Sequence, residues 1–154
     1  LLSPSGRYLM DKDVAQAIAG RLNKIGLKIN VRVLEWGVYV KQILSRKTES
    51  PMFLLGWGND TFDADGTLFP MFRSGERFSF YSNPEFDKYV DLGRSTLDPE
   101  KRKEYYSKAL HILYDDPGWI FLYQQKDLYG ASKRIKWEAR SDERIFLIDV
   151  DWNK

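Results

Sequence analysis

The sequence predicts an α/β fold, in which a mixed sheet with a parallel helix–strand–helix–strand core is flanked by further helices. The first observation behind this prediction is that helical and extended hydrophobic patterns alternate over residues 12–56, as they do in parallel units with right-handed crossovers. The second is composition: 43% of the 154 residues are apolar and 30% are charged. A chain of this size and composition can bury a core.

A first helix is predicted over residues 12–25. Its apolar residues recur at the spacing of one helical face; they are Val14, Ile18, Leu22 and Ile25. Asp11 or Asp13 can cap the start of this helix. Gly26 stands where a left-handed residue commonly ends one.

Two strands and a second helix follow. Apolar and polar residues alternate over residues 27–33, which predicts a half-exposed strand that ends near Trp36. A helix is predicted over residues 38–46, and the apolar run within residues 52–56 predicts a strand buried on both faces. Because the two strands are expected to point the same way, Trp36 and Trp57 stand at matching ends and can line one cleft.

The second half of the chain is predicted to be helical first and extended later. Asn83 and Asp98 are suited to cap helices that begin at Pro84 and Pro99. The elements expected in chain order are helices at about 67–72, 85–95 and 99–114, followed by extended segments at about 119–123, 126–137 and 144–152.

The main candidate for a binding site is the loop Gly56-Trp57-Gly58-Asn59-Asp60, directly after the second strand. Two glycines around a tryptophan indicate a backbone that turns sharply and can approach a ligand closely. In open α/β sheets, ligands bind where such loops leave the carboxyl ends of strands. An ordinary connection with a tryptophan in the core explains the same residues, so the local pattern leaves both interpretations open.

The aspartates Asp60, Asp63 and Asp65 suggest further chemistry. A calcium loop starting at Thr61 is rejected, because position twelve would be Phe72, where a bidentate glutamate is required. An acid–base pair, as in a glycosidase or another hydrolase, is one alternative. A carboxylate beside a tryptophan can instead pair with the ammonium group of a ligand. A non-catalytic interaction domain, rich in core aromatic residues, is a third possibility.

Composition argues against several classes of function. The net charge of +2 gives no electrostatic footprint for nucleic acid, so no nucleic-acid partner is expected. Cysteine is absent, which removes disulfides, zinc–thiolate sites and cysteine nucleophiles. The single histidine, His111, falls on the predicted solvent face of its helix, so neither a metal nor a cofactor is expected. No apolar run approaches the roughly 18 residues of a membrane span.

In this order, the segments resemble the C-terminal lobe of the bacterial peptide/nickel-type (family 5) solute-binding proteins of ABC importers. The residues that carry the resemblance are Glu35-Trp36, residues 56–60, residues 63–72, Tyr81 to Asp87, Arg102 to Tyr106 and residues 112–123. The similarity covers nearly the whole chain. It implies one lobe of a periplasmic-binding-protein-like fold, in which two lobes close around a ligand by hinge motion.

The resemblance implies a receptor, not an enzyme. Such a receptor captures di- or oligopeptides, or a related ligand such as glutathione, a sugar or a nickel chelate, for import. In peptide-binding members an aspartate three residues after the strand-end tryptophan holds the peptide's α-amino group, and Asp60 has that position relative to Trp57. Trp57 and Trp36 match aromatic residues that line side-chain pockets. The backbone of Gly58 and Asn59 would approach the ligand.

The resemblance also implies partners and a location. Residues 1–154 would form a single domain and a fragment, the C-terminal lobe of a protein whose N-terminal lobe lies in the same chain. A membrane permease of the importer would receive the ligand. The protein would be periplasmic or a cell-surface lipoprotein, with its export signal outside this fragment. Many peptide binders carry Asp-Pro where this chain has Asp63-Ala64, so a peptide is favoured and the kind of ligand stays open.

Overall fold

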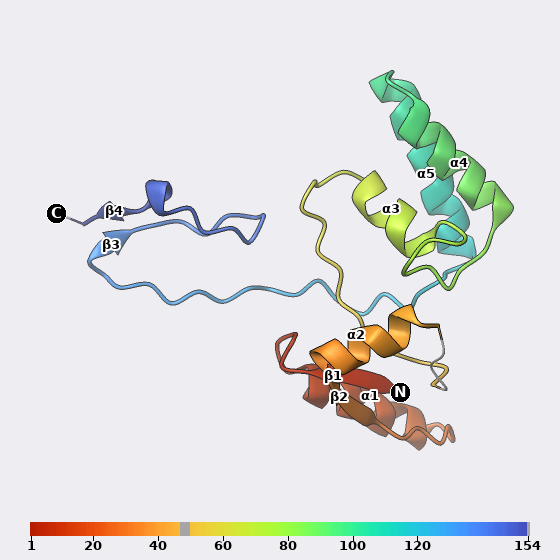
Figure 1. Cartoon of the computed structure of the whole chain (residues 1–154), viewed down its shortest axis with the longest axis horizontal. Helices are drawn as coiled ribbons and strands as arrows, with labels where there is room; N and C mark the ends of the chain where they lie inside the picture. The colour runs from red at the N-terminus through yellow and green to blue at the C-terminus, as the bar shows by residue number, and fades with distance from the viewer. Residues whose placement is uncertain (47–49, 154) are drawn as a thin grey trace. The chain divides into compact units, whose positions relative to one another are not determined.

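Figure 1 shows the computed structural model of the chain, which describes residues 1–46 and 50–153. The chain divides into two compact units, residues 1–118 and residues 119–154. Each unit has its own two-stranded sheet. The single domain expected over residues 1–154 stays a prediction.

The first unit is built on a short parallel sheet. Strand β1 (Leu2–Ser5) pairs in parallel with β2 (Arg32–Glu35) over four residues. On its other side, Leu2 forms one parallel bridge with Phe53. The predicted parallel arrangement is therefore confirmed, whereas the strand predicted over residues 52–56 is reduced to this bridge.

Pro4 explains why the third strand is so short. Leu2 donates from its N–H to the Met52 carbonyl and accepts from the Leu54 N–H, both at 2.9 Å. Two residues on, the same edge of β1 presents Pro4, which has no N–H to donate. The Leu54 carbonyl accepts a hydrogen bond from the Tyr39 hydroxyl instead. A side-chain hydrogen bond thus replaces the backbone hydrogen bond that would extend the sheet.

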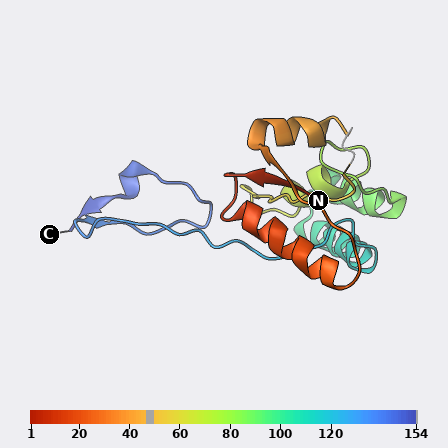
Figure 2. The same cartoon turned by 90° about the horizontal axis from the view of Figure 1, so that it is seen from below.

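Two helices cover the two faces of this sheet. Figure 2 shows α1 (Asp11–Lys24) and α2 (Trp36–Leu44) on opposite sides of the strands. Tyr39 and Ile43 of α2 are buried with Leu2 in a common core. The half-buried side chains around them are Leu34, Trp36, Val40, Phe53 and Leu55.

The buried face of helix α1 is shifted from the predicted one towards two alanines. Ala15 and Ala19 are its buried apolar residues, and the predicted stripe of larger side chains is less buried, with Ile25 at its end 74% exposed. Small side chains let a helix approach a sheet closely, so the larger ones flank the contact. Gly26 has a φ of 93°, which confirms the predicted left-handed stop.

The strand predicted over residues 27–33 is wrong for most of its length, because β2 begins only at Arg32. The backbone of Ile29 is bonded by a side chain and not by a neighbouring strand. Its N–H donates to Asn23 Oδ1 at 2.7 Å, and Asn23 Nδ2 donates to its carbonyl at 3.3 Å. The alternating pattern here belongs to a connection, in which Leu27 is half exposed.

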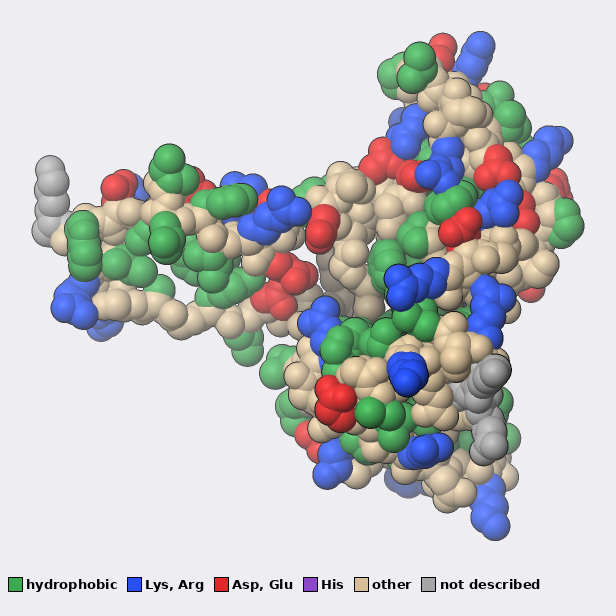
Figure 3. All heavy atoms as spheres, in the orientation of Figure 1, with side chains coloured by type: hydrophobic (Ala, Val, Ile, Leu, Met, Phe, Trp, Pro, Cys, Tyr) green, Lys and Arg blue, Asp and Glu red, His purple; other side chains and the backbone are tan. Residues whose placement is uncertain are grey.

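Three more helices complete the first unit: α3 (Asp65–Phe72), α4 (Pro84–Ser95) and α5 (Pro99–Asp115). Figure 1 shows α4 and α5 side by side as a hairpin. Both predicted caps are confirmed, since Asn83 and Asp98 each accept two hydrogen bonds from backbone N–H groups of the following turn. Figure 3 shows acidic and basic side chains interspersed over this region.

The second unit is mostly extended chain. Strand β3 (Ile135–Lys136) pairs antiparallel with β4 (Asp151–Trp152), and a 3₁₀ turn, η1, covers Leu147–Asp149. The apolar segment predicted as a strand at 119–123 forms none. The segments predicted at 126–137 and 144–152 contain only these short pieces.

Exposure explains these corrections. An apolar run predicts a strand on the assumption that other elements cover it. Figure 3 shows hydrophobic side chains at the surface of the second unit. Most of its large apolar side chains are exposed, Ile120 by 81% and Ile148 by 92%. Over the two described stretches of the chain, no helix is both long and apolar enough to cross a membrane.

Candidate ligand-binding site

The loop between β1 and α1 carries Arg7 and Tyr8, and Asp11 organises it. The buried Asp11 carboxylate accepts hydrogen bonds from the backbone N–H groups of Gly6 at 3.3 Å, Arg7 at 3.0 Å, Tyr8 at 3.2 Å and Lys12 at 2.8 Å. The sequence suggested Asp11 as a cap for the helix. Most of its bonds instead hold the loop that precedes the helix.

The backbone dipoles around Asp11 stabilise its charge. Burial by itself would raise the pKa of this carboxyl group. The four N–H donors outweigh burial, so the pKa of Asp11 lies below its ordinary value. The loop therefore folds around an ionised carboxylate at the start of a helix, where negative charge is favoured.

Trp36, a predicted site residue, lies directly after β2 as the first residue of α2. The Glu35 carboxylate accepts from the N–H groups of Gly37 and Val38, so the helix starts two residues earlier than predicted. The Trp36 ring stacks on Tyr39, with centroids 5.8 Å apart and planes 21° apart. The buried Tyr39 thus fixes Trp36 at the end of the sheet.

Arg7 and Tyr8 reach Trp36 from the neighbouring loop. The Tyr8 ring meets Trp36 edge-on, with centroids 5.9 Å apart. The Arg7 guanidinium lies 5.2 Å from the Trp36 ring centroid and 5.3 Å from that of Tyr8. Within residues 1–46 and 50–153 this guanidinium forms no ion pair with a carboxylate. An exposed cation held on two aromatic rings can receive an anionic group.

Tyr8 also joins this cluster to the candidate loop. Its hydroxyl donates to the Gly56 carbonyl at 3.0 Å. A Cβ at Gly56 would lie 2.8 Å from the Tyr8 ring, so the ring packs on the backbone only because residue 56 is glycine. Two loops that follow neighbouring parallel strands are thereby held together at the carboxyl edge of the sheet.

Trp57 and Gly58 form the next part of the loop. Trp57 is 39% exposed, its Nε1 donates to the Gly66 carbonyl at 3.0 Å, and its ring meets Phe78 edge-on at 5.3 Å. Gly58 is exposed, and a Cβ there would meet nothing within 4 Å. Trp57 is thus oriented by the protein, while no contact in the described chain accounts for the glycine beside it.

The Asn59 side chain holds the loop in shape. Its Nδ2 donates to the Asp63 carbonyl at 2.7 Å and to Thr67 Oγ1 at 3.1 Å, and its Oδ1 accepts from Thr61 Oγ1 at 2.8 Å. A Cβ at Gly66 would lie 2.4 Å from Asn59 Oδ1. The side chain is therefore used inside the loop, and the backbone is the part of Asn59 that was predicted to approach a ligand.

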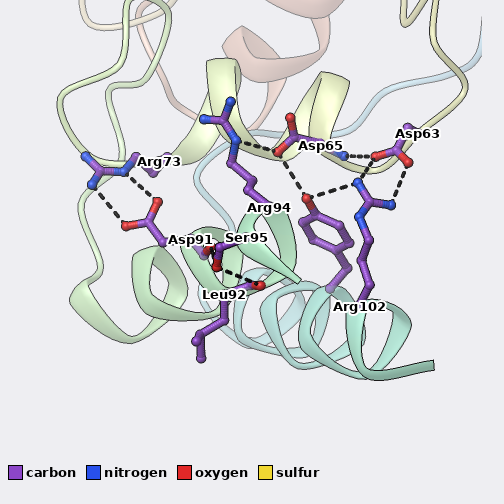
Figure 4. A network of polar contacts seen from close by, with 9 residues as sticks. Asp63, Asp65, Arg73, Asp91, Leu92, Arg94, Ser95 and Arg102 are labelled. Atoms are coloured by element: carbon purple, nitrogen blue, oxygen red, sulfur yellow. Dashed lines mark hydrogen bonds and ion pairs between the residues drawn. The ribbon is translucent and has the colours of Figure 1, made fainter. Parts of the chain in front are cut away.

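The three aspartates have different surroundings. Asp60 is exposed on the loop. Figure 4 shows Asp63 bonded by both terminal nitrogens of Arg102, at 2.6 and 2.7 Å, and Asp65 paired with Arg94 at 3.1 Å. Asp63 and Asp65 are thus both engaged by arginines.

The pKa shifts in this cluster do not favour acid–base catalysis. The hydrogen bonds from Arg102 lower the pKa of Asp63. Burial, together with a hydrogen bond to Asp65, raises the pKa of Tyr106 to about 12. Both pKa values move away from neutral pH, where a general acid or base works best.

Metal ligands are not grouped in the part of the chain that the structure describes: it contains no set of three or more His, Cys, Asp or Glu side chains that could hold an ion. His111 is exposed on α5, as predicted, and its Nδ1 lies 2.7 Å from the Ser107 carbonyl of the preceding turn.

Four of the five predicted site residues lie in one loop, residues 57–60. The fifth, Trp36, packs on Tyr8, whose hydroxyl donates to Gly56 at the start of the candidate loop. Arg7 and Tyr8 were not predicted. Their signal is that they follow a strand at the same end as the two tryptophans. That strand has four residues, including a proline, so its pattern was too short to locate its end.

Comparison with known families identifies the chain's relatives. A profile of the family described as bacterial extracellular solute-binding proteins, family 5 Middle, matches residues 1–79. This stretch is just over half of the chain. It contains Arg7, Tyr8 and all five predicted site residues.

Two curated relatives match over longer stretches. The probable di/tripeptide-binding protein 5 of Pseudomonas aeruginosa (strain UCBPP-PA14) is 30% identical over 128 residues, which covers 78% of this chain and 22% of that protein. The oligopeptide-binding protein AppA of Bacillus subtilis (strain 168) is 25% identical over 146 residues, which covers 92% of this chain and 26% of that protein. The chain therefore spans about a quarter of the length of these relatives.

Two solved structures share the fold. The crystal structure of a peptide ABC transporter, peptide-binding protein, matches with a TM-score of 0.67 at 25% identity, over 76% of this chain and 52% of that one. The dipeptide binding protein of Pseudoalteromonas sp. SM9913, in complex with Met-Leu, matches with a TM-score of 0.65 at 26% identity, over 76% of this chain and 24% of that one. The predicted periplasmic-binding-protein-like α/β fold is confirmed. The chain belongs to the family 5 bacterial extracellular solute-binding proteins.

Proposed function

We propose that this chain is the ligand-binding lobe of an ABC-importer receptor, and that it captures a peptide by the peptide's charged ends. The observation that carries the proposal is the presence of opposite charges, Arg7 and Asp60, on two loops at the carboxyl edge of one sheet. These loops are joined by the hydrogen bond from Tyr8 to Gly56.

A free peptide is a zwitterion, so a site for it needs an anion for the ammonium group and a cation for the carboxylate. Asp60 accepts hydrogen bonds from the ammonium group, and Arg7 donates to the carboxylate. Charge-assisted hydrogen bonds of this kind strengthen when a closing site excludes water. The stacking of Arg7 on Trp36 and Tyr8 orients its guanidinium before the ligand arrives.

Trp36 and Trp57 line the space for the peptide side chains, and the exposed backbone at Gly58 and Asn59 runs along the peptide chain. Indole rings offer a large apolar surface at little cost in conformational entropy. Both rings are already oriented by Tyr39 and Phe78, respectively. The site is therefore largely formed before binding, which reduces the ordering cost.

The names of relatives support a ligand with a free ammonium group. They include di/tripeptide-binding and oligopeptide-binding proteins and the glutathione-binding protein GsiB of Pectobacterium atrosepticum. Because these proteins are several times longer than this chain, we assign residues 1–154 to the C-terminal lobe of a two-lobed protein. Its N-terminal lobe would close over the ligand, and the closed receptor would deliver the ligand to a membrane permease from outside the cytoplasm.

Binding without catalysis is the better-supported role. The hydrolase alternative requires a pair of available carboxylates in the loop. Asp63 and Asp65 are bonded to Arg102 and Arg94 instead. These bonds support a role for both carboxylates in holding the loop.

The test is isothermal titration calorimetry on the whole polypeptide that contains this chain. The ligands are a panel of di- to pentapeptides, glutathione, an oligosaccharide and a nickel–histidine chelate. We expect at least one peptide to bind, and Asp60→Ala to weaken it on the order of 100-fold, as for truncation of one partner of a desolvated charge pair. Asp13→Ala, an exposed aspartate on α1, is the control and should leave affinity unchanged. A wild-type protein that binds no peptide would end this proposal.

A further inference from the structure

The loop that presents Trp57 and Asp60 has no regular secondary structure of its own. It runs from the bridge at Phe53 to the start of α3 without a helix or strand. Its shape therefore depends on side-chain bonds. Asn59 supplies three of those within the loop, and the bonds of Asp63 and Asp65 reach other helices.

Asp63 ties the loop to α5. Arg102, in the second turn of that helix, donates from Nη1 to Asp63 Oδ2 at 2.6 Å and from Nη2 to Oδ1 at 2.7 Å. Two parallel bonds of this kind fix orientation as well as distance. Oδ1 of Asp63 also accepts from the Asp65 N–H at 2.9 Å, and the Asp63 carbonyl accepts from Asn59. Asp63 therefore forms both the ion pair with α5 and hydrogen bonds within the loop.

Tyr106, in the α4–α5 hairpin, supports the Arg102–Asp63 ion pair. It is buried, its hydroxyl donates to Asp65 Oδ1 at 3.0 Å, and the Arg102 guanidinium lies 4.8 Å from its ring centroid. The ring packs on Gly93 of α4, where a Cβ would come within 2.8 Å of it. Arg102 therefore stands on a rigid support that includes both helices.

We propose that Arg102 is a positioning residue for ligand recognition: through Asp63 it holds the loop so that Asp60 and Trp57 face the ligand. This inference rests on the proposed function, because it assigns Arg102 a role in the same site. Arg102 does not touch the ligand in this account. It acts by fixing the one loop that carries the ammonium anchor.

Arg73 provides a matched control. It forms a similar two-bond pair with Asp91, at 3.3 and 3.1 Å, also drawn in Figure 4. That pair joins the end of α3 to α4 and includes no residue of the loop. Removing either arginine deletes one arginine–aspartate pair, but only Arg102 is bonded to the loop that carries Asp60.

The test uses the whole polypeptide and two probes: the tightest-binding dipeptide of the panel, and the same dipeptide with its amine acetylated. The readout is the ratio of the two affinities, which measures recognition of the ammonium group. Arg102→Met should reduce this ratio about tenfold. Arg102→Lys, which cannot form two parallel bonds, should reduce it by less. Arg73→Met should leave it at the wild-type value.

The double variant Asp60→Ala/Arg102→Met separates positioning from general damage. Its ratio should equal that of Asp60→Ala alone, because the same recognition cannot be lost twice. If Arg102→Met weakens both probes equally, Arg102 is merely structural and the inference is wrong. If that variant does not fold, an unchanged ratio in Arg102→Lys overturns the inference. A wild-type ratio near one would instead contradict the proposed ammonium anchor.

Discussion

Asp11 shows how one buried carboxylate can shape a binding loop at the scale of a residue. Its four backbone donors include the N–H groups of Arg7 and Tyr8. Asp11→Ala leaves these partly buried donors without their acceptor. We expect the free energy of unfolding of the whole polypeptide to fall by about 2–4 kcal/mol, measured by urea denaturation. The exposed Asp13→Ala, in the same helical turn, should change it by less than about 1 kcal/mol.

The effect of Asp11 should depend on pH in one direction. Its pKa is lower in the folded state, so its stabilisation is present above the unfolded pKa, near 4, and is lost as pH falls through the folded value. The difference in the free energy of unfolding between wild type and Asp11→Ala should therefore be constant near neutral pH and should become smaller below about pH 4. A difference that stays the same down to pH 2 would show that the charge of Asp11 is not what stabilises the loop.

Substitution by alanine should have opposite effects on stability at Gly66 and Gly20. Both are within helices, where alanine is favoured over glycine by about 1 kcal/mol. A Cβ at Gly20 meets nothing within 4 Å, so Gly20→Ala should stabilise the protein by about that amount. At Gly66 the Cβ would lie 2.4 Å from Asn59 Oδ1. Gly66→Ala should displace Asn59, lower the melting temperature and weaken peptide binding. Equal shifts for the two variants would contradict this.

Single residues were predictable where their neighbours in sequence determine their role. Trp57 was proposed from the glycines that mark the end of a strand beside it, and Asp60 from its position three residues after Trp57; both stay predictions. Arg7 was not found, because its role depends on where β1 ends and on a tryptophan 29 positions further along the chain. Asp11 was assigned to the helix that follows it, whereas most of its donors belong to the loop before it.

At the scale of elements, the link between the loop and α5 should appear in acid unfolding. The bonds from Arg102 lower the pKa of Asp63, so this pair stabilises the protein above the unfolded pKa of Asp63, near 4, and ceases to do so as pH falls through the folded pKa. Arg102→Met should therefore destabilise the protein at pH 7 and lose part of that effect below about pH 4. Thermal melting of both proteins between pH 2 and 7 checks this. An Arg102→Met deficit that grows on acidification would contradict the assignment.

The helices were predictable and the strands largely were not, for a physical reason. A helix is bounded by local signals, and Asn83, Asp98 and Gly26 all act as their positions predicted. A strand needs a partner that the local pattern does not contain. Pro4 shortens the third strand by withholding an N–H, and Asn23 replaces the partner of Ile29 with a side chain. Pro4 lies outside the predicted strand at 52–56, and Asn23 lies outside the one predicted at 27–33, so neither local pattern contains the residue that limits it.

At the scale of the molecule, the proposed function predicts that residues 1–154 supply one side of a two-lobed site. Asp60 and Trp57 are exposed. A second lobe that excludes water would strengthen the ionic contacts proposed between the peptide ends and Asp60 and Arg7. Residues 1–154 alone should therefore bind the best peptide at least about 100-fold more weakly than the whole polypeptide, a loss of about 2.8 kcal/mol. Calorimetry on both proteins checks this, with circular dichroism to establish that the shorter one is folded. Equal affinities would contradict the two-lobed assignment.

The second unit shows why the whole molecule was the hardest scale to predict. Its apolar runs have the composition of buried strands, yet within the unit most of these side chains remain exposed. The core of the first unit was easier to anticipate, since Tyr39 and Ile43 meet Leu2 within one helix–strand layer. Pattern therefore predicted burial correctly only where the covering element lies within the same unit.

The central claim is that Asp60 receives the ammonium group of a peptide, and one measurement tests it most directly. The affinity of the whole polypeptide is measured by calorimetry for a dipeptide and for its N-acetylated form, in wild type and in Asp60→Asn. We predict that the wild type prefers the free amine on the order of 100-fold and that Asp60→Asn, which keeps the shape and removes the charge, brings this preference close to one. A preference that is unchanged in Asp60→Asn would contradict the account.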